Sequence, residues 1–352
     1  MAEVKKDIRS LDKEALRAFF EQNGDRAFRG DQVYQWLWQK GVHSFTAMTN
    51  LSLPTRQLLE THFTINHIAI DRQQRSTDGT IKNAVRLHDG LVVESVMIPT
   101  LERTTACVSS QVGCSLDCTF CATALLKRMR NLNPDEIFDQ VKAIDKQSRL
   151  YYQRPLSNIV FMGMGEPLMN YNNVIKAIEK ITTPEGLGMS AKRITVSTSG
   201  VPKMIRKLAD ENCNVKLALS LHSARQEVRE QIMPFAKNFP LSEIEEALHY
   251  WYQQKGKNTT LEYIVWKGIN DTQKDIDALI AFCKRVPSKV NLIQYNTIGD
   301  PNFKQADRTV IAAYQSQLEA ARITVTIRHS RGQDIDAACG QLANRSTQQN
   351  NV

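Results

Sequence analysis

Three cysteines in the stretch Cys114-Ser115-Leu116-Asp117-Cys118-Thr119-Phe120-Cys121 indicate the fold of this 352-residue chain. Three thiolates at this spacing can ligate three irons of a 4Fe–4S cube and leave the fourth iron without a protein ligand. An open iron can chelate the amino and carboxylate groups of a methionine-like cofactor and pass one electron to its sulfonium. Structural zinc is the alternative, but it commonly uses paired Cys-x-x-Cys units, and no second unit follows here. The triplet therefore predicts a cluster at Cys114, Cys118 and Cys121.

Strand-like and helical segments alternate from Thr105 onward. The expected strands are residues 105–109, 158–162, 194–198, 215–221, 261–265, 290–295 and 323–328. A helix start is clear between the first two, where Asn133 can cap and Pro134 takes the first position. Such alternation predicts an α/β fold with a parallel sheet, open or closed into a barrel.

The sequence before this region predicts two smaller units. Helical spacing of apolar residues, with Ser52 as a cap, predicts helices within residues 1–66. Trp36 and Trp38 there belong either to a core or to a platform for stacking RNA bases. Strand-like segments 64–70, 81–87 and 91–98, separated by Asp-Gly turns, predict an antiparallel meander over residues 67–99. We expect a main domain over residues 100–339 and a flexible tail over 340–352.

Composition limits the function classes. Hydrophobic residues make up 42% of the chain, so a packed core is expected rather than disorder. A net charge of +8 suits a phosphate-rich partner such as nucleic acid, or simply an ordinary basic enzyme. The seven cysteines are odd in number and three of them lie within eight residues, which argues against a secreted disulfide framework. No apolar run approaches the roughly 18 residues of a membrane span, and no signal peptide is visible, so we expect a cytoplasmic protein without a membrane partner.

The cysteine triplet, with an aromatic residue before its last cysteine, resembles the radical SAM superfamily. That resemblance implies S-adenosylmethionine (SAM) as a second cofactor and a partial (β/α)6 barrel. Polar or glycine-rich residues follow several expected strands, at the edge where parallel βα barrels build active sites. Taken singly, such residues are usually structural, and their shared position is the informative part. The expected SAM-binding residues are Gly165, Glu166, Ser197, Ser220, Leu221, His222 and Asn296.

Four further motifs resemble the RlmN family of adenosine methyltransferases over nearly the whole chain. They are Val92-Val93-Glu94-Ser95-Val96, residues 109–114, residues 161–168 and residues 334–342. The last contains Cys339, and ordinary radical SAM enzymes have no cysteine there. The N-terminal helical domain, which the family would use as an RNA-binding accessory, is the loosest part of the match.

The resemblance implies roles for three residues. The family moves a methyl group from SAM to a cysteine, here Cys339, because carbon 2 of adenine is electrophilic and cannot attack the sulfonium. Cys107 would release the product and leave a Cys107–Cys339 disulfide, and Glu94 would accept the carbon-2 proton. The alternatives are inert buried thiols for the two cysteines and a solvated strand carboxylate for Glu94. Cys213 and Cys283 match no role.

The family substrates are an adenosine in 23S rRNA and the adenosine 3′ of the anticodon in some tRNAs. We expect both RNAs as partners, a flavodoxin or ferredoxin as electron donor, and a monomer. Similar relatives methylate carbon 8 instead, and a non-catalytic Fe–S RNA-binding protein is another alternative. A radical SAM enzyme acting on a small molecule would leave the basic charge unexplained. The loop 124–129 lacks the family's glycines, and Lys127, Arg128 and Arg130 either contact phosphates or are simply solvated.

Overall fold

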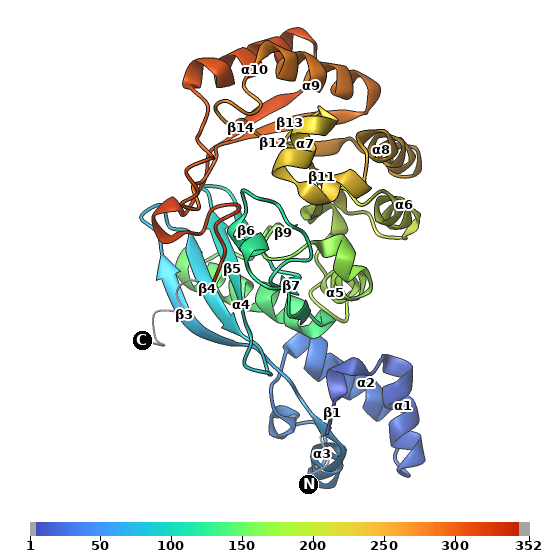
Figure 1. Ribbon diagram of the computed structural model, residues 1–352. Coiled ribbons are helices and arrows are strands. Elements are labelled where there is room, and N and C mark those ends of the chain that lie inside the picture. Colours follow the sequence, from blue (N-terminus) through green and yellow to red (C-terminus); the bar gives the residue numbers. More distant parts are fainter. Residues whose placement is uncertain (1–4, 345–352) are drawn as a thin grey trace.

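A single ten-stranded sheet organises the computed structural model, which describes residues 5–344 (Figure 1). Seven neighbouring strands are parallel. They are β6 (Thr104–Cys107), β9 (Asn158–Phe161), β10 (Ile194–Thr198), β11 (Lys216–Ser220), β12 (Thr259–Ile264), β13 (Ser288–Ile293) and β14 (Val325–Arg328). They match the seven strands expected from the sequence. The sheet order runs from β14 to β3 without pairing the two ends, so the barrel is partial.

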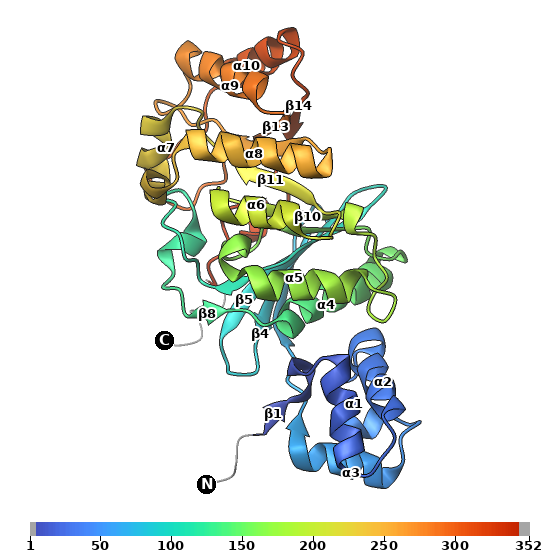
Figure 2. The same cartoon turned by 90° about the vertical axis from the view of Figure 1, so that its right-hand side faces the viewer.

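Helices follow the parallel strands and cover the outer face of the sheet, as Figure 2 shows. They are α4 (Pro134–Tyr152), α5 (Tyr171–Thr182), α6 (Pro202–Asp210), α8 (Leu241–Lys255), α9 (Gln273–Arg285) and α10 (Arg308–Ala320). The short helix α7 (Gln226–Ile232) lies beside the cysteine triplet instead, where its last carbonyl, that of Ile232, accepts a hydrogen bond from Thr119. Helix α4 begins as expected, with Asn133 and Glu136 forming a capping box and Pro134 in the first turn. Six strand–helix connections and a seventh strand confirm the partial (β/α)6 barrel.

The antiparallel strands β3 (Ala69–Arg75), β4 (Ile81–Arg86) and β5 (Val92–Pro99) form the expected meander. β5 pairs with β6, so the meander extends the barrel sheet. The expected first strand at 64–70 was wrong, because most of β3 lies further along the chain. β3 is an edge strand and carries the polar run 71–75, so it lacks the apolar alternation that marks a half-buried strand.

The N-terminal region contains α1 (Lys13–Gln22), α2 (Phe28–Tyr34) with a π-helical extension (Gln35–Lys40), and α3 (Leu53–His62). Asp12 and Ser52 cap α1 and α3 through their side chains. Trp38 is buried against Phe138 of α4, with ring centroids 5.3 Å apart, and therefore belongs to the core. The Lys40 ammonium lies 3.4 Å from the centroid of the Trp36 ring. The remaining short elements are β1 (Lys6–Asp7), β2 (Phe63–Thr64), β7 (Gln111–Val112), β8 (Arg130–Asn131) and 3-10 turns at Ile8–Ser10, Phe45–Ala47, Ala122–Leu125, Pro167–Asn170, Ala191–Arg193, Pro234–Asn238 and Gln333–Ile335.

Buried ion pairs join the N-terminal helices to α4. The Arg9 guanidinium lies 3.0 Å from the Asp135 carboxylate and 2.8 Å from the Asp139 carboxylate, and all three side chains are buried. Burial raises the pKa of Asp135, and the Arg9 charge opposes that rise. Since a buried charge is tolerated when it is paired, these contacts hold the helical region in a defined place against the barrel.

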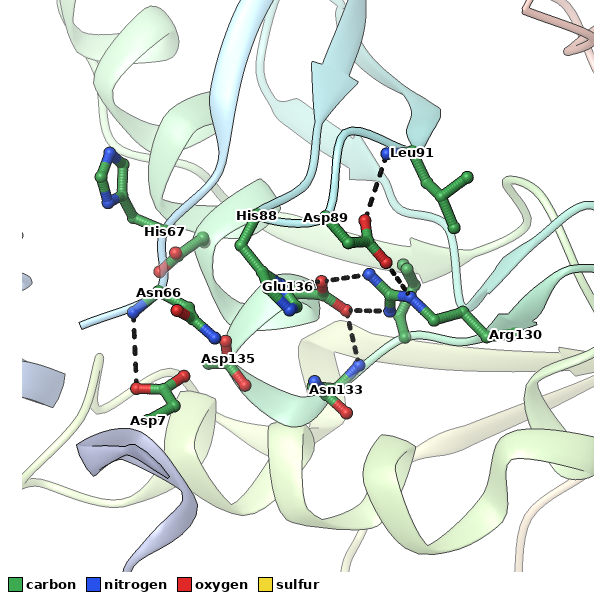
Figure 3. Close-up of polar contacts among 12 residues, drawn as sticks. Asp7, Asn66, His67, His88, Asp89, Leu91, Arg130, Asn133, Asp135 and Glu136 are labelled. Atoms are coloured by element: carbon green, nitrogen blue, oxygen red, sulfur yellow. Dashed lines mark hydrogen bonds and ion pairs between the residues drawn. The ribbon is translucent and has the colours of Figure 1, made fainter. Parts of the chain in front are cut away.

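A second polar network occupies the start of α4, shown in Figure 3. Arg130 donates two hydrogen bonds to the Glu136 carboxylate and one to Asp89, while His88 lies 3.2 Å from Glu136. Arg130 is therefore paired within the protein and is not a simply solvated cation, one of the two alternatives for this loop. Lys127 and Arg128, in the same loop, are exposed.

No helix within residues 5–344 has both the length and the apolar character needed to cross a bilayer.

Candidate active site

The three cysteines of the triplet line one cavity at the carboxyl ends of the parallel strands. Their loop is held from outside, where Asp117 accepts a hydrogen bond from the Phe235 N–H at 2.9 Å and Thr119 bonds the Ile232 carbonyl. Gly113 precedes the triplet with a φ of 76°, and a Cβ there would lie 2.6 Å from the Lys127 carbonyl oxygen. Only glycine therefore lets this turn pack against the basic loop.

The donor set of this cavity fits an iron–sulfur cluster. Burial raises the pKa of Cys114 to about 12, and burial together with the neighbouring thiols raises that of Cys118. No three His, Cys, Asp or Glu side chains of residues 5–344 are arranged to hold one metal ion. In a 4Fe–4S cluster each thiolate bonds a different iron, so the three sulfurs need not converge on a single ion. Cys114, Cys118 and Cys121 would hold the cluster, whose positive iron core favours their thiolate forms.

The turn after β9 forms the wall next to the triplet. Gly165 has a φ of 94°, and a Cβ there would lie 2.5 Å from the Gln111 side chain, so the position requires glycine. The Glu166 carboxylate accepts hydrogen bonds from the Leu168 N–H at 3.0 Å and the Ser199 N–H at 2.7 Å. Burial raises the pKa of Glu166, and these bonds oppose the rise. Glu166 thereby ties the turn after β9 to the end of β10.

Four other expected SAM-binding residues, Ser197, Ser220, His222 and Asn296, also line this cavity. His222 has a φ of 55°, and burial lowers its pKa to about 3, so the ring is neutral. Its Nδ1 atom accepts a hydrogen bond from the Ile264 N–H at 3.2 Å, which leaves the proton on Nε2. Leu221 does not line the cavity: its side chain is fully buried, and its N–H bonds the Glu262 carbonyl.

A second cavity of about 560 Å³ lies along the inner face of the sheet and contains Cys107. Cys339 lines both cavities. The segment that carries Cys339 is held by the Asn296 side chain, which donates to the Cys339 carbonyl at 3.2 Å, and by the Ala122 N–H, which donates to the Gly340 carbonyl at 2.7 Å. The structure thus brings together two cysteines that are 232 positions apart, while Cys213 and Cys283 line neither cavity.

Arg328 and Glu262 also line both cavities, and the sequence reasoning missed them. Arg328 ends β14, and the negative charges of Cys339, Glu262 and Cys107 raise its pKa. Burial raises the pKa of the Cys107 thiol to about 12, Cys339 adds to the rise, and Arg328 opposes it. Asn296 was selected because it follows an expected strand, at the edge where parallel βα barrels build active sites. The same criterion, applied to the last strand, would have found Arg328. No sequence pattern distinguishes Glu262.

Glu94 lines neither cavity. Its side chain is 1% exposed, so the alternative of a solvated strand carboxylate is wrong. One carboxylate oxygen accepts hydrogen bonds from the Ala343 N–H at 2.9 Å and the Asn344 N–H at 3.2 Å. Glu94 therefore anchors the segment that follows Cys339. The first part of the expected flexible tail is held by hydrogen bonds, from Ala343 and Asn344 to Glu94 and from Thr123 to the Leu342 carbonyl. Residues 345–352 lie outside the described residues.

Comparison with known proteins agrees with this geometry. The Radical SAM superfamily model matches residues 108–283, and the model of the ribosomal RNA large subunit methyltransferase N-terminal domain matches residues 6–65. A crystal structure of a radical SAM methyltransferase from Sphaerobacter thermophilus superimposes with a TM-score of 0.89 and 35% identity, covering 96% of this chain and 99% of that one. The protein is thus a radical SAM enzyme, with a 4Fe–4S cluster and SAM as its cofactors.

Curated relatives define the family more closely. A probable dual-specificity RNA methyltransferase RlmN of Christiangramia forsetii is 70% identical over 97% of both chains. The dual-specificity RNA methyltransferase RlmN of Geotalea uraniireducens is 41% identical, again over 97% of both chains. The chain belongs to the RlmN family, and it is a SAM-dependent methyltransferase.

Proposed function

We propose that the protein methylates carbon 2 of an adenosine in RNA, with 23S rRNA and tRNA as substrates. The relatives' names include RNA methyltransferase and dual specificity, which supports the RNA substrate and the pair of RNAs. The observation that carries the chemistry is the position of Cys339, which borders both the cavity of the cluster cysteines and the cavity of Cys107. A methyl carrier must reach the methyl donor on one side and the substrate on the other.

When bound, the two cofactors supply a methyl group and a carbon-centred radical. Cys339 accepts the methyl group at its sulfur and later, after loss of one hydrogen atom from that methyl, bonds through it to carbon 2 of the base. The adduct would then lose the carbon-2 proton to Glu94 and one electron, for which the oxidised cluster held by Cys114, Cys118 and Cys121 would be the acceptor. Cys107 attacks the Cys339 sulfur as a thiolate, the sulfur–carbon bond breaks toward the base, and the former methylene takes up a proton. Each turnover leaves a Cys107–Cys339 disulfide, which two further electrons must reduce.

Glu94 is the proposed acceptor of the carbon-2 proton. In the described conformation its carboxylate holds the backbone of Ala343 and Asn344 and faces Lys82, and not the cavities. Acceptance of a proton therefore requires this segment to release the carboxylate. The same contacts position Cys339 while the segment is bound, so Glu94 serves both carrier placement and proton removal in this proposal.

The second cavity suits an unstacked base attached to a phosphate backbone. Its lining includes Cys107, Cys339 and Arg328 near the carboxyl ends of the strands, and four more cations. These cations are Arg103, Lys216, Lys289 and Arg331. Its volume of about 560 Å³ falls within the range of about 300–1,000 Å³ for small-molecule sites. A base must leave its stack to reach such a site, and cations in its lining favour the attached phosphates.

The identity of the methylated nucleoside distinguishes a carbon-2 methyltransferase from a carbon-8 methyltransferase. Purified enzyme should be incubated anaerobically with rRNA and tRNA from a strain that lacks it, and the RNA digested to nucleosides. Chromatography against synthetic standards should show 2-methyladenosine in both RNAs. A product of 8-methyladenosine alone would replace carbon 2 with carbon 8. Cluster binding with SAM cleavage but no methylated RNA would support a small-molecule substrate. The cytoplasm, a monomer and a flavodoxin- or ferredoxin-type electron donor remain parts of this proposal.

A further inference from the structure

Arg229 is a completely buried cation on α7. One of its terminal nitrogens, Nη2, donates a hydrogen bond to the Ser199 carbonyl. The other two side-chain nitrogens, Nε and Nη1, are buried without a hydrogen-bond partner. An unsatisfied buried N–H group costs about 1–3 kcal/mol, and more when the group is charged. The side chain therefore needs a partner that residues 5–344 do not supply.

The other buried arginine provides an internal comparison. Arg9 has ion pairs with both Asp135 and Asp139. Arg229 has no carboxylate within ion-pair distance among residues 5–344. A guanidinium keeps its proton under all ordinary conditions, so burial cannot neutralise it as it would a lysine. Buried charges in proteins are paired, and Arg9 obeys that rule through the chain itself while Arg229 does not.

The surroundings of Arg229 identify where the missing negative charge lies. Its helix ends against the cysteine triplet: Thr119 donates to the Ile232 carbonyl at 3.0 Å, and the Phe235 N–H donates to Asp117 at 2.9 Å. Desolvation lowers the pKa of Arg229 to about 10, and the interaction with Cys118 opposes that shift. The His222 ring, also near Arg229, is neutral. The Phe235 ring packs on the guanidinium with its centroid 5.8 Å from Cζ. Gly200 lets the guanidinium approach, since a Cβ there would lie 3.3 Å from Nη2.

We propose that Arg229 is the charge partner of the iron–sulfur cluster and sets its reduction potential from behind Cys118. Three thiolates make the oxidised cluster site negative, and reduction by one electron makes it more negative. A fixed buried cation stabilises the reduced state more than the oxidised state and so raises the reduction potential. Arg229 does not line the cavity that Cys118 lines, so it is a positioning residue that acts through the cluster and not a SAM ligand.

Redox titration of the reconstituted full-length enzyme tests the proposal without using activity. Arg229→Met removes the charge and keeps the length, while Arg229→Lys keeps a cation. At one fixed applied potential, the ratio of reduced to oxidised cluster, read by electron paramagnetic resonance, should fall about tenfold in Arg229→Met. That change corresponds to about 59 mV for one electron. Arg229→Lys should recover most of the wild-type ratio.

Arg225→Met is the matched control. Arg225 is the N-cap residue of α7, four positions before Arg229, and it already has ion pairs with Glu227 and Asp275. The Arg225→Met variant should leave the ratio unchanged. An unchanged ratio in Arg229→Met would overturn the proposal. So would an unchanged ratio with a loss of SAM affinity, which would make Arg229 a SAM-binding residue instead.

A stability measurement covers the case in which Arg229→Met binds too little iron to titrate. Without the cluster, Arg229 is an unpaired buried charge, so stripped Arg229→Met should unfold at a higher urea concentration than the stripped wild type. With the cluster, the order should reverse or the variant should lose iron more readily. A purely structural arginine would give the opposite sign in the stripped protein, because methionine cannot replace its bond to Ser199. Either result is independent of which RNA atom the enzyme methylates.

Discussion

The Lys82 ammonium lies 3.4 Å from the Glu94 carboxylate, and both side chains are almost completely buried. Lys82 also donates to the Asp336 carbonyl at 3.3 Å. The pair therefore joins strands β4 and β5 to the segment that carries Cys339, and its loss should affect both stability and catalysis.

Lys82→Met should destabilise the protein by about 3–5 kcal/mol, because it leaves the Glu94 carboxylate buried without its partner. Urea unfolding measures this loss. Arg86→Met, on the same strand, removes an exposed pair with Asp71 and should cost about 0–1 kcal/mol. The double variant Lys82→Met with Glu94→Gln should recover part of the stability. Equal losses in the free energy of unfolding for Lys82→Met and Arg86→Met would show that the buried Lys82–Glu94 pair stabilises the protein no more than an exposed pair does.

Replacing Cys114, Cys118 or Cys121 by alanine should abolish cluster binding and methylation, because an open cluster site needs all three thiolates. Wild-type protein reconstituted without oxygen should hold about four irons per chain by metal analysis. Cys213→Ala is the control and should keep its iron. One tightly bound zinc and no iron would contradict the assignment of the triplet.

Cys107→Ala should still accept a methyl group at Cys339 and still bond to RNA, but it should not release the product. A protein–RNA adduct should then survive a denaturing gel with labelled RNA. Cys339→Ala should form neither adduct nor product, because it has no methyl carrier. Normal turnover by Cys107→Ala would exclude the resolving role, and an adduct mapped to Cys213 or Cys283 would identify a different carrier.

Release of the adduct should accelerate with pH. The Cys107 pKa is raised to about 12, so the nucleophilic thiolate is scarce at neutral pH and increases about tenfold per pH unit between pH 7 and 9. Arg328→Met should slow release further, since the Arg328 charge lowers the Cys107 pKa, and Arg328→Lys should slow it less. Single-turnover decay of the adduct at several pH values measures the effect. A rate that is flat with pH would mean that thiolate formation does not limit release.

Lys216→Glu and Lys289→Glu should weaken RNA binding and reduce its dependence on salt, because each lysine is exposed and lines the second cavity. Loss of one phosphate contact should lower the slope of log affinity against log salt by about 0.7–0.9. Lys284→Glu, on the outer helix α9, changes the same charge away from the cavity. SAM cleavage without RNA should be unaffected. Equal effects of all three variants would indicate only a general charge attraction.

Much of the fold could be predicted because it depends on local patterns. The seven strands of the barrel showed as apolar runs, and the caps at Ser52 and Asn133 are set by residues within one helical turn. The position of strand β3 could not be predicted, because most side chains of this edge strand are exposed to solvent and such a strand needs no alternation of apolar residues. Its register depends on its pairing with β4, not on its own sequence.

The sequence by itself determined the cysteine triplet, the glycine-rich turns and the parallel α/β order, because ligand spacing and backbone conformation are properties of neighbouring residues. Only the tertiary structure decided how the long-range groups act. Glu94 is buried because Ala343 and Asn344, about 250 positions away, bond to it. Arg130 is engaged by Glu136 and Asp89, while no carboxylate in the described part of the chain pairs with Arg229. The charge state and role of a buried group depend on which distant groups desolvate and pair with it, and that arrangement exists only in the folded chain.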